Sequence, residues 1–336
     1  MKRLILASAA LAAASAMAIA PAHAQKTYKM KIGMVTINDS NHFSAKWQKK
    51  YIEEKSGGRV KVGVFPAAQL GKIPRQIEGV QLGTQEAFNI PPGFFIGIDK
   101  RFMVTDAPGM FDDENHATRA VNVPEFFDKF TTMGAKKGFV ITSLWGCGAT
   151  SIATLKPFKT IDELKGRKIR VLATPLEREV IKSLGATGIP IPYSEVLPGL
   201  QRRTIDGVRS SIGVMHPSKF WTVAKHITLT GMAQITCGQF TSTAWLKTLP
   251  ADLKKIVLDS AKLVTPKAGA WGYDLTRQAE KNWAGEKGAF VYNLSASDKA
   301  DLMKRVKPIA DKVLGGDPKT KAIYALLKKV AAATRQ

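Results

Sequence analysis

The sequence is poor in the residues that most often build catalytic and metal centres. It has 2 cysteines and 5 histidines in 336 residues. It contains no CxxC pair, no His/Cys cluster at metal-ligand spacing, no GxGxxG after a strand pattern, no GxxxxGK[ST] loop and no GxSxG elbow. A Cys147–His–Asn arrangement assembled by the fold stays open, although nothing local supports it. The sequence therefore predicts a protein without metal, cofactor or enzymatic chemistry.

Long apolar runs are absent after the N-terminus. Met1-Lys2-Arg3 is a charged n-region, an alanine-rich apolar run follows from Leu4 to Ala20, and Ala22-His23-Ala24 fits the small-x-small cleavage signal. The run is short and ends in Pro21, which favours a cleaved signal peptide (residues 1–24) over a membrane anchor. We expect an exported mature chain in a bacterial periplasm.

Acidic residues are scarce: 27 Asp and Glu stand against 50 Lys and Arg, a net charge of +23. Such an excess can indicate a nucleic-acid or lipid partner. The basic residues are dispersed, however, and no aromatic ladder accompanies them. We expect solvated surface charge and no nucleic acid, while a cationic protein that holds anionic polymers is the alternative.

The first part of the chain alternates strand and helix patterns. Residues 28–36 and 60–64 show the period of half-buried strands, and between them apolar residues recur at helical spacing up to Gly57-Gly58. A further helix pattern ends at Gly83, and residues 86–90 predict another strand. This order is typical of an α/β fold.

Later segments continue the same pattern. One helix is predicted around Glu114–Phe130, and a strand over residues 139–145 is predicted to break at Gly146-Cys147-Gly148. Residues 237–242 are a candidate returning strand. A helical pattern then runs from Leu253 through Val264, and can be followed as far as Trp283.

The most informative stretch is Lys165 to Val171. Thr160 and Glu163 form a capping-box pattern that predicts a short helix, and Gly166 can adopt the left-handed conformation that ends it. Residues 168–171 then alternate as a strand, which places Arg170 near its carboxyl end, where α/β folds carry ligand groups. Arginine pairs with a carboxylate through two parallel hydrogen bonds. A solvated strand-end cation is the alternative.

Motifs on both sides of Arg170 carry a family resemblance. The chain reads "LKGRKIRV", then "GATGIPIPYSEV", then "LQRRTIDGV", and earlier "GGRVKVGVFPAAQLG". In this order they resemble the DctP-type solute-binding proteins of TRAP (tripartite ATP-independent periplasmic) transporters, and the resemblance covers residues 26–330. In that family the arginine of the "KxRV" strand clamps the ligand carboxylate, and here that position is Arg170.

The resemblance implies a two-lobe α/β periplasmic binding protein (type II-like) with crossing hinge strands and a long helix that spans both lobes. The first lobe would comprise residues 25–147 plus 236–275, and the second 148–235 plus 276–336. The protein would be a monomer that binds a small organic acid between the lobes. It would deliver the acid to a membrane permease of two integral subunits, which an ion gradient drives.

Four further residues are predicted to shape the site, because they lie on strand ends or loops that face the cleft in this family. They are Ser210, Tyr193, Asn89 and Trp145. Tyr193 and Trp145 would supply flat apolar walls with a polar edge. For Trp145, an ordinary place in the core is the alternative.

Two departures from the family pattern bear on the ligand. Thr150 or a neighbour stands where related proteins often have a second arginine, and "DGxEN" is replaced by a motif that ends in Arg209 and Ser210. Tyr193 agrees with the family's aromatic residue before "SEV". One ligand carboxylate is thus expected, and an aromatic or branched monocarboxylate is as plausible as a C4-dicarboxylate. A binding protein of an ABC importer, or a ligand-sensing partner of a receptor, is the competing class.

The two cysteines, Cys147 and Cys237, would face an oxidising compartment. The resemblance places both on the strands that cross between the lobes, close enough for a disulfide. Two small buried thiols that never meet are the alternative.

Overall fold

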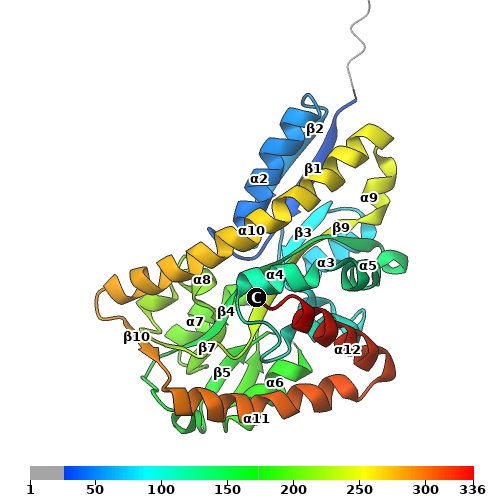
Figure 1. Ribbon diagram of the computed structural model, residues 1–336. Helices are drawn as coiled ribbons and strands as arrows, with labels where there is room; N and C mark the ends of the chain where they lie inside the picture. The colour runs from blue at the N-terminus through cyan, green and yellow to red at the C-terminus, as the bar shows by residue number, and fades with distance from the viewer. Residues whose placement is uncertain (1–25, 173) are drawn as a thin grey trace, which may run out of the picture.

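The computed structural model describes residues 26–172 and 174–336 (Figure 1). The predicted signal peptide, residues 1–24, lies outside the described residues. Strands and helices alternate along most of the described chain, as the sequence patterns predicted.

The strands form a single mixed sheet. Their order is β2-β1-β3-β9-β4-β7-β5-β6, with β8 paired to β4 and β10 paired to β8. Strand β9 is antiparallel to β3 and β4, and β4 is also antiparallel to β7 and β8. The other pairs are parallel. The bounds are β1 Tyr28–Gly33, β2 Val60–Phe65, β3 Ala87–Ile90, β4 Phe139–Thr154, β5 Lys168–Val171, β6 Thr187–Pro190, β7 Gly207–Ser211, β8 His226–Leu229, β9 Gln234–Ser242 and β10 Phe290–Asn293.

The strand β4 connects two lobes. Its first part, Phe139 to Ala149, pairs with β9, and its last part, Thr150 to Thr154, pairs with β7. The first lobe contains β1, β2 and β3, and the second contains β5, β6, β7, β8 and β10. The antiparallel strands β4 and β9 therefore cross between the lobes, which agrees with the expected hinge.

The predicted break at Gly146-Cys147-Gly148 is wrong, because β4 continues through it with a shift in register between Gly146 and Gly148. Glycines make this irregularity possible. Gly148 has a φ of +122°, and a Cβ at Gly146 would lie 2.3 Å from the carbonyl oxygen of Glu114. Gly146 and Gly148 therefore mark a bulge that admits a neighbouring helix, and not the end of the strand.

Helices pack around the sheet in both lobes. Their bounds are α2 Ser40–Lys55, α3 Ile73–Leu82, α4 Glu114–Val121, α5 Pro124–Thr131, α6 Pro175–Ser183, α7 Val196–Gln201, α8 Ile212–Met215, α9 Thr243–Thr248, α10 Ala251–Gly285, α11 Ala296–Gly315 and α12 Pro318–Ala333. Short 3₁₀ helices include η1 Pro92–Phe95, η2 Lys100–Asp106, η4 Ile161–Leu164 and η5 Tyr193–Glu195. Within the described residues, no helix has both the length and the apolar character needed to cross a bilayer.

The long helix α10 has 35 residues and runs diagonally across the molecule in Figure 1, from α9 to β10. It contacts α2 in the first lobe and α8 and β10 in the second. The expected helix that spans both lobes is therefore present, and it continues to Gly285.

Two local predictions need correction. The single helix expected around Glu114–Phe130 is two helices, because Pro124 occupies the start of α5 and forces an extended conformation on Val123. The helix expected after Thr160 is only the 3₁₀ turn η4. There the Thr160 hydroxyl bonds the Glu163 carboxylate (3.1 Å) and does not cap a backbone N–H.

The C-terminal helices bridge the lobes. The helix α11 packs on α6 of the second lobe, whereas α12 contacts η2, α4 and α5, which precede β4 in the chain. One large apolar cluster accordingly includes residues of both halves, such as Phe102, Ile169 and Leu327. The lobe boundaries expected from the sequence stay a prediction.

Candidate ligand-binding site

A small cavity lies where the lobes meet. Its volume is about 40 Å³. Its wall includes residues that follow β1 and β3 in the first lobe, residues of β5, η5, β7 and α8 in the second, and residues of the crossing strands. They are Val35, Thr36, Asn41, Pro91, Phe94, Cys147, Arg170, Leu172, Tyr193, Ser210, Val214, Ile235 and Cys237. Typical ligand pockets measure about 300–1,000 Å³, so the residues of the two lobes leave little free space here.

Arg170 is the cation of this cavity. It is the third residue of β5, and its side chain is 1% exposed. Its Nε donates to the carbonyl oxygen of Ile191 (3.3 Å), and its guanidinium lies 5.6 Å from the centre of the Tyr193 ring. In residues 26–172 and 174–336, no carboxylate forms an ion pair with it. Burial lowers the pKa of the Arg170 guanidinium, and the nearby Glu177 carboxylate opposes that shift.

A second buried arginine of this lobe has a carboxylate partner, which Arg170 lacks among the described residues. Arg209 of β7 is also 1% exposed, and its Nη1 forms an ion pair with Glu177 of α6. The other carboxylate oxygen of Glu177 accepts from the backbone N–H of Leu172 (2.7 Å). A buried charge without a partner is costly. Both arginines are thus buried, but only Arg209 has a carboxylate partner among the described residues, which leaves Arg170 available to an anion.

Tyr193 and Ser210 line the cavity beside Arg170. The Tyr193 hydroxyl donates to Ser218 Oγ (2.8 Å), which fixes the ring. Burial raises the pKa of Tyr193, so the phenol stays neutral. The Ser210 hydroxyl has no hydrogen-bond partner among the residues described, although Ser210 is only 5% exposed. Three of the five predicted site residues are therefore brought together.

Asn89 and Trp145 are absent from the described residues that line the cavity. The Asn89 side chain is buried in β3, where its Nδ2 donates to the carbonyl oxygen of Asn41 (3.0 Å). Trp145 is fully buried, and its Nε1 donates to Ser40 Oγ (3.1 Å). Both therefore bond to the start of α2, one layer behind the wall.

Thr36, Asn41 and Phe94 belong to the first-lobe wall and were not predicted from the sequence. Asn41 Nδ2 donates to Asp39 Oδ2 (3.1 Å), while its Oδ1 is buried with no partner in the part of the chain that the structure describes. A signal was present, because these residues follow β1 and β3, and the carboxyl ends of parallel strands meet at the ligand crevice.

Cys147 and Cys237 form a disulfide, with their Cα atoms 5.8 Å apart, so the predicted bridge is confirmed. It links β4 to β9 and lies in the cavity wall. Cys237 is paired in register with Trp145, and Cys147 lies at the register shift beyond it. The bridge therefore ties together the two strands that cross between the lobes, at the site itself.

A buried carboxyl group of the first lobe faces the second. Asp106 ends η2, and its Oδ2 is buried without a hydrogen-bond partner among the described residues. Burial raises the pKa of Asp106 well above its usual value. Glu177 raises it further, while Arg209 and a hydrogen bond with Thr174 oppose the shift. Gly93 lies against this group, since a Cβ there would be 2.4 Å from Asp106 Oδ2 and 2.8 Å from Thr174 Cγ2.

The fold has well-matched solved counterparts. A TRAP periplasmic solute-binding protein from Desulfovibrio salexigens, solved with bound orotic acid, superimposes with a TM-score of 0.86 at 23% identity, and the match covers 92% of this chain and 100% of that one. At this level of identity the likeness shows the fold, which is that of the two-lobe binding proteins.

Sequence comparison gives relatives as well. The 2,3-diketo-L-gulonate-binding periplasmic protein YiaO of Escherichia coli K12 is 32% identical over 57% of this chain and 58% of its own length. A solute-binding protein of Verminephrobacter eiseniae is 31% identical over 63% of this chain and 64% of its own. The chain thus spans less than two thirds of these two relatives.

The family itself is established by a longer match. The sequence profile of the bacterial extracellular solute-binding proteins of family 7, named DctP, matches residues 33–316. This range contains the cavity residues and nearly all of the sheet. The chain therefore belongs to the DctP family, the bacterial extracellular solute-binding proteins of family 7.

Proposed function

We propose that this protein binds a small organic acid between its lobes, with the acid's carboxylate on Arg170. One observation carries the proposal: Arg170 is buried at the interlobe cavity without a carboxylate partner among the described residues, whereas Arg209 on the next strand is paired with Glu177. A hydrogen-bonded pair that involves a charged group contributes about 1.5–3 kcal/mol. The ligand would supply the anion that Arg170 lacks.

The other cavity residues would complete the site. The free Ser210 hydroxyl and the Asn41 amide would bond polar groups of the ligand, and the Tyr193 ring would form an apolar wall. Asn89 and Trp145 would act indirectly, because they hold Asn41 and Ser40 at the start of α2. Among the described residues of the wall, Arg170 alone has a charged side chain, so one carboxylate would be anchored by an ion pair.

The relatives support an acid as the ligand. The E. coli relative is named for binding 2,3-diketo-L-gulonate, and the Desulfovibrio protein was solved with orotic acid. Both compounds are carboxylic acids, one an open-chain sugar acid and the other a pyrimidine. A carboxylate anchor shared by these proteins, in pockets that otherwise differ, would account for the different acids.

The biological role would be transport. The protein would leave the cytoplasm through a signal peptide cleaved after Ala24 and work as a monomer in the periplasm, without catalysis. Hinge motion on β4 and β9 would close the lobes, with a division near residues 147–148, 235–236 and 275–276. The closed form would pass the acid to a TRAP permease of two integral membrane subunits. N-terminal sequencing of exported protein, with Gln25 first, tests the cleavage site.

The ligand class is tested by mass spectrometry of the small molecules that copurify with the protein. Purified protein is denatured, filtered, and the filtrate compared with that of an Arg170→Ala preparation. We expect an organic acid, close to one per chain, in the first filtrate and its loss from the second. A neutral sugar or an amino acid, retained by both proteins, would contradict the proposal.

A further inference from the structure

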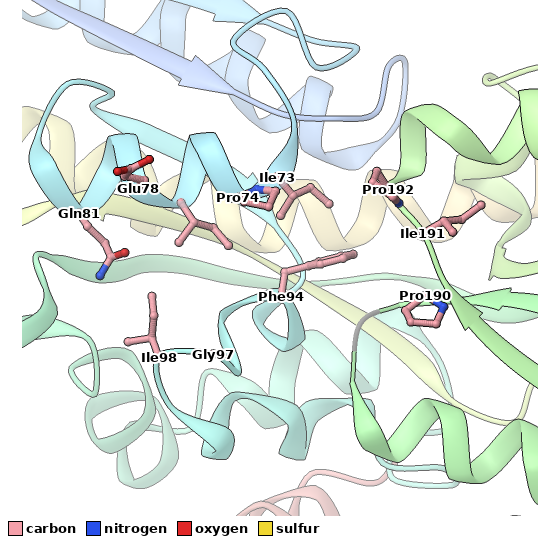
Figure 2. A pocket seen from close by; sticks show the side chains of 11 residues that line it. Ile73, Pro74, Glu78, Gln81, Phe94, Gly97, Ile98, Pro190, Ile191 and Pro192 are labelled. Atoms are coloured by element: carbon pink, nitrogen blue, oxygen red, sulfur yellow. The ribbon is translucent and has the colours of Figure 1, made fainter.

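An apolar groove lies on the outer side of the interlobe cavity (Figure 2). Its volume is about 380 Å³, far larger than the cavity that contains Arg170. In Figure 2, Phe94 lies in the middle of the groove, with the start of α3 on one side and residues 190–192 on the other. One wall thus belongs to each lobe, and the groove is complete only when the lobes are closed.

The groove and the cavity share a residue. The side chain of Phe94 is half-buried and lines both. On the other side, Ile191 lines the groove while its carbonyl oxygen accepts the hydrogen bond from Arg170 Nε (3.3 Å). Ile191, which lines the groove, is therefore in direct contact with Arg170, the carboxylate anchor. A rotation of the Phe94 side chain would connect the groove with the cavity.

The lining of the groove is almost entirely apolar. Its side chains are those of Ile73, Pro74, Ile77, Phe94, Ile98, Pro190, Ile191 and Pro192, while Glu78 and Gln81 are its polar members. An exposed salt bridge between Lys72 Nζ and Glu195 Oε1 (2.5 Å) connects the two lobes beside the groove, because Lys72 precedes Ile73 and Glu195 follows Pro192 in the chain. Burial of a hydrocarbon tail against such an apolar surface is favourable, whereas the surface offers few hydrogen-bond partners to hydroxyl groups.

We propose that the groove binds the apolar tail of the ligand, whose carboxylate lies on Arg170. The enclosed cavity has room for little more than a head group, and Phe94 would move aside for the rest. The ligand class is then a monocarboxylate with an alkyl or aryl tail, in place of a dicarboxylate or a polyhydroxylated acid. This inference rests on the proposed function, because it needs the carboxylate at Arg170.

The test is a calorimetric titration with butanoate, hexanoate and octanoate. Each methylene group that enters the groove should raise the affinity about fourfold until the groove is filled. Ile77→Asp and Pro74→Asp place a carboxylate in the groove. Each should weaken octanoate binding at least tenfold and change butanoate binding less than twofold. Leu82→Asp is the matched control, since Leu82 is on the same helix, is 67% exposed and is not among the described lining residues.

Thermal unfolding of each variant checks that it folds. If Ile77→Asp does not fold, Pro74→Asp still provides the test, because Pro74 is exposed in the first turn of α3, where a carboxylate is tolerated. The tail site is overturned if the affinity of the unmodified protein does not depend on chain length. It is also overturned if affinity rises with chain length in both groove variants as steeply as in the unmodified protein. If binding of all three acids also disappears in Arg170→Ala, the carboxylate anchor survives that failure. If none of the three acids binds the unmodified protein, the tail site fails, and the proposed function is judged separately with the copurified acid. Binding that does not depend on Arg170 contradicts the proposed function as well as the tail site.

Discussion

Arg209 and Glu177 form an ion pair that is almost completely buried in the second lobe, with exposed side-chain fractions of 1% and 3%. It leaves Arg170, on the neighbouring strand β5, as the buried arginine without a carboxylate among the described residues. Glu177 thus neutralises the Arg209 cation inside the lobe, and Arg209 is not among the described residues that line the cavity.

The first prediction concerns that pair. Glu177→Gln should lower the free energy of unfolding by about 3–5 kcal/mol, because it strands the Arg209 charge in the interior. Urea denaturation measures the difference, and Glu179→Gln on the exposed face of the same helix is the control. A loss no larger than that of the control would show that Arg209 has another partner.

The second prediction concerns Asp106 and pH. Its pKa is raised in the folded protein, mainly by burial, so the folded state holds a proton that the unfolded state has released. Stability from this group is therefore present at low pH and is lost as the pH rises from about 3.9, the unfolded value, through the folded pKa. Asp106→Asn removes this loss. The difference in unfolding temperature between the Asp106→Asn variant and the unmodified protein should increase with pH and then level off.

Thermal unfolding of both proteins from pH 4 to pH 8 provides the measurement. The exposed Asp128→Asn variant controls for the removal of one negative charge. A difference that decreases as the pH rises has the wrong sign and would mean that Asp106 is ionised in the folded protein.

The third prediction concerns the disulfide. Replacing Cys147 and Cys237 together by Ala should cost about 2–4 kcal/mol of stability, because the bridge closes a loop with a sequence separation of 90 residues. Reductant should bring the unmodified protein towards the variant and leave the variant unchanged. Two free thiols in unfolded, unreduced protein would show instead that the bridge does not form.

The fourth prediction concerns contact between the lobes at Gly93. Gly93→Ala places a methyl group 2.8 Å from Thr174 Cγ2 of the second lobe and 2.4 Å from Asp106 Oδ2 of its own lobe, so the new methyl group opposes closure. We expect ligand affinity to fall about tenfold, roughly 1.4 kcal/mol. Gly97→Ala, where no atom of the described residues lies within 4 Å of the new Cβ, should bind normally. Equal affinities in the two variants would mean that closure does not compress this contact.

Much of the site was predictable because it depends on local sequence. The strand over residues 168–171 has a clear period, and its position in an α/β order puts Arg170 at the crevice. The family resemblance supplied Tyr193 and Ser210, and it placed the two cysteines on the crossing strands, where the bridge is found.

The remainder depends on packing that no local pattern records. The glycines at residues 146–148 look like a strand end, and only the approach of α4 shows that they form a bulge. The sequence names no partner for Arg209, and only the fold places Glu177, 32 residues away, beside it. Asn41 and Phe94 belong to the site because the first lobe closes on the second, which the order of residues along the chain does not specify.

The central claim is that Arg170 anchors the ligand carboxylate, and calorimetric titration with the copurified acid tests it most directly. Arg170→Ala should weaken binding well over tenfold, since about 1.5–3 kcal/mol depends on the pair. Arg170→Lys should not restore it, because lysine lacks the two-pronged guanidinium. Arg178→Ala, an exposed arginine of the same lobe, should bind normally. Affinity in Arg170→Ala close to that of the unmodified protein would contradict the account.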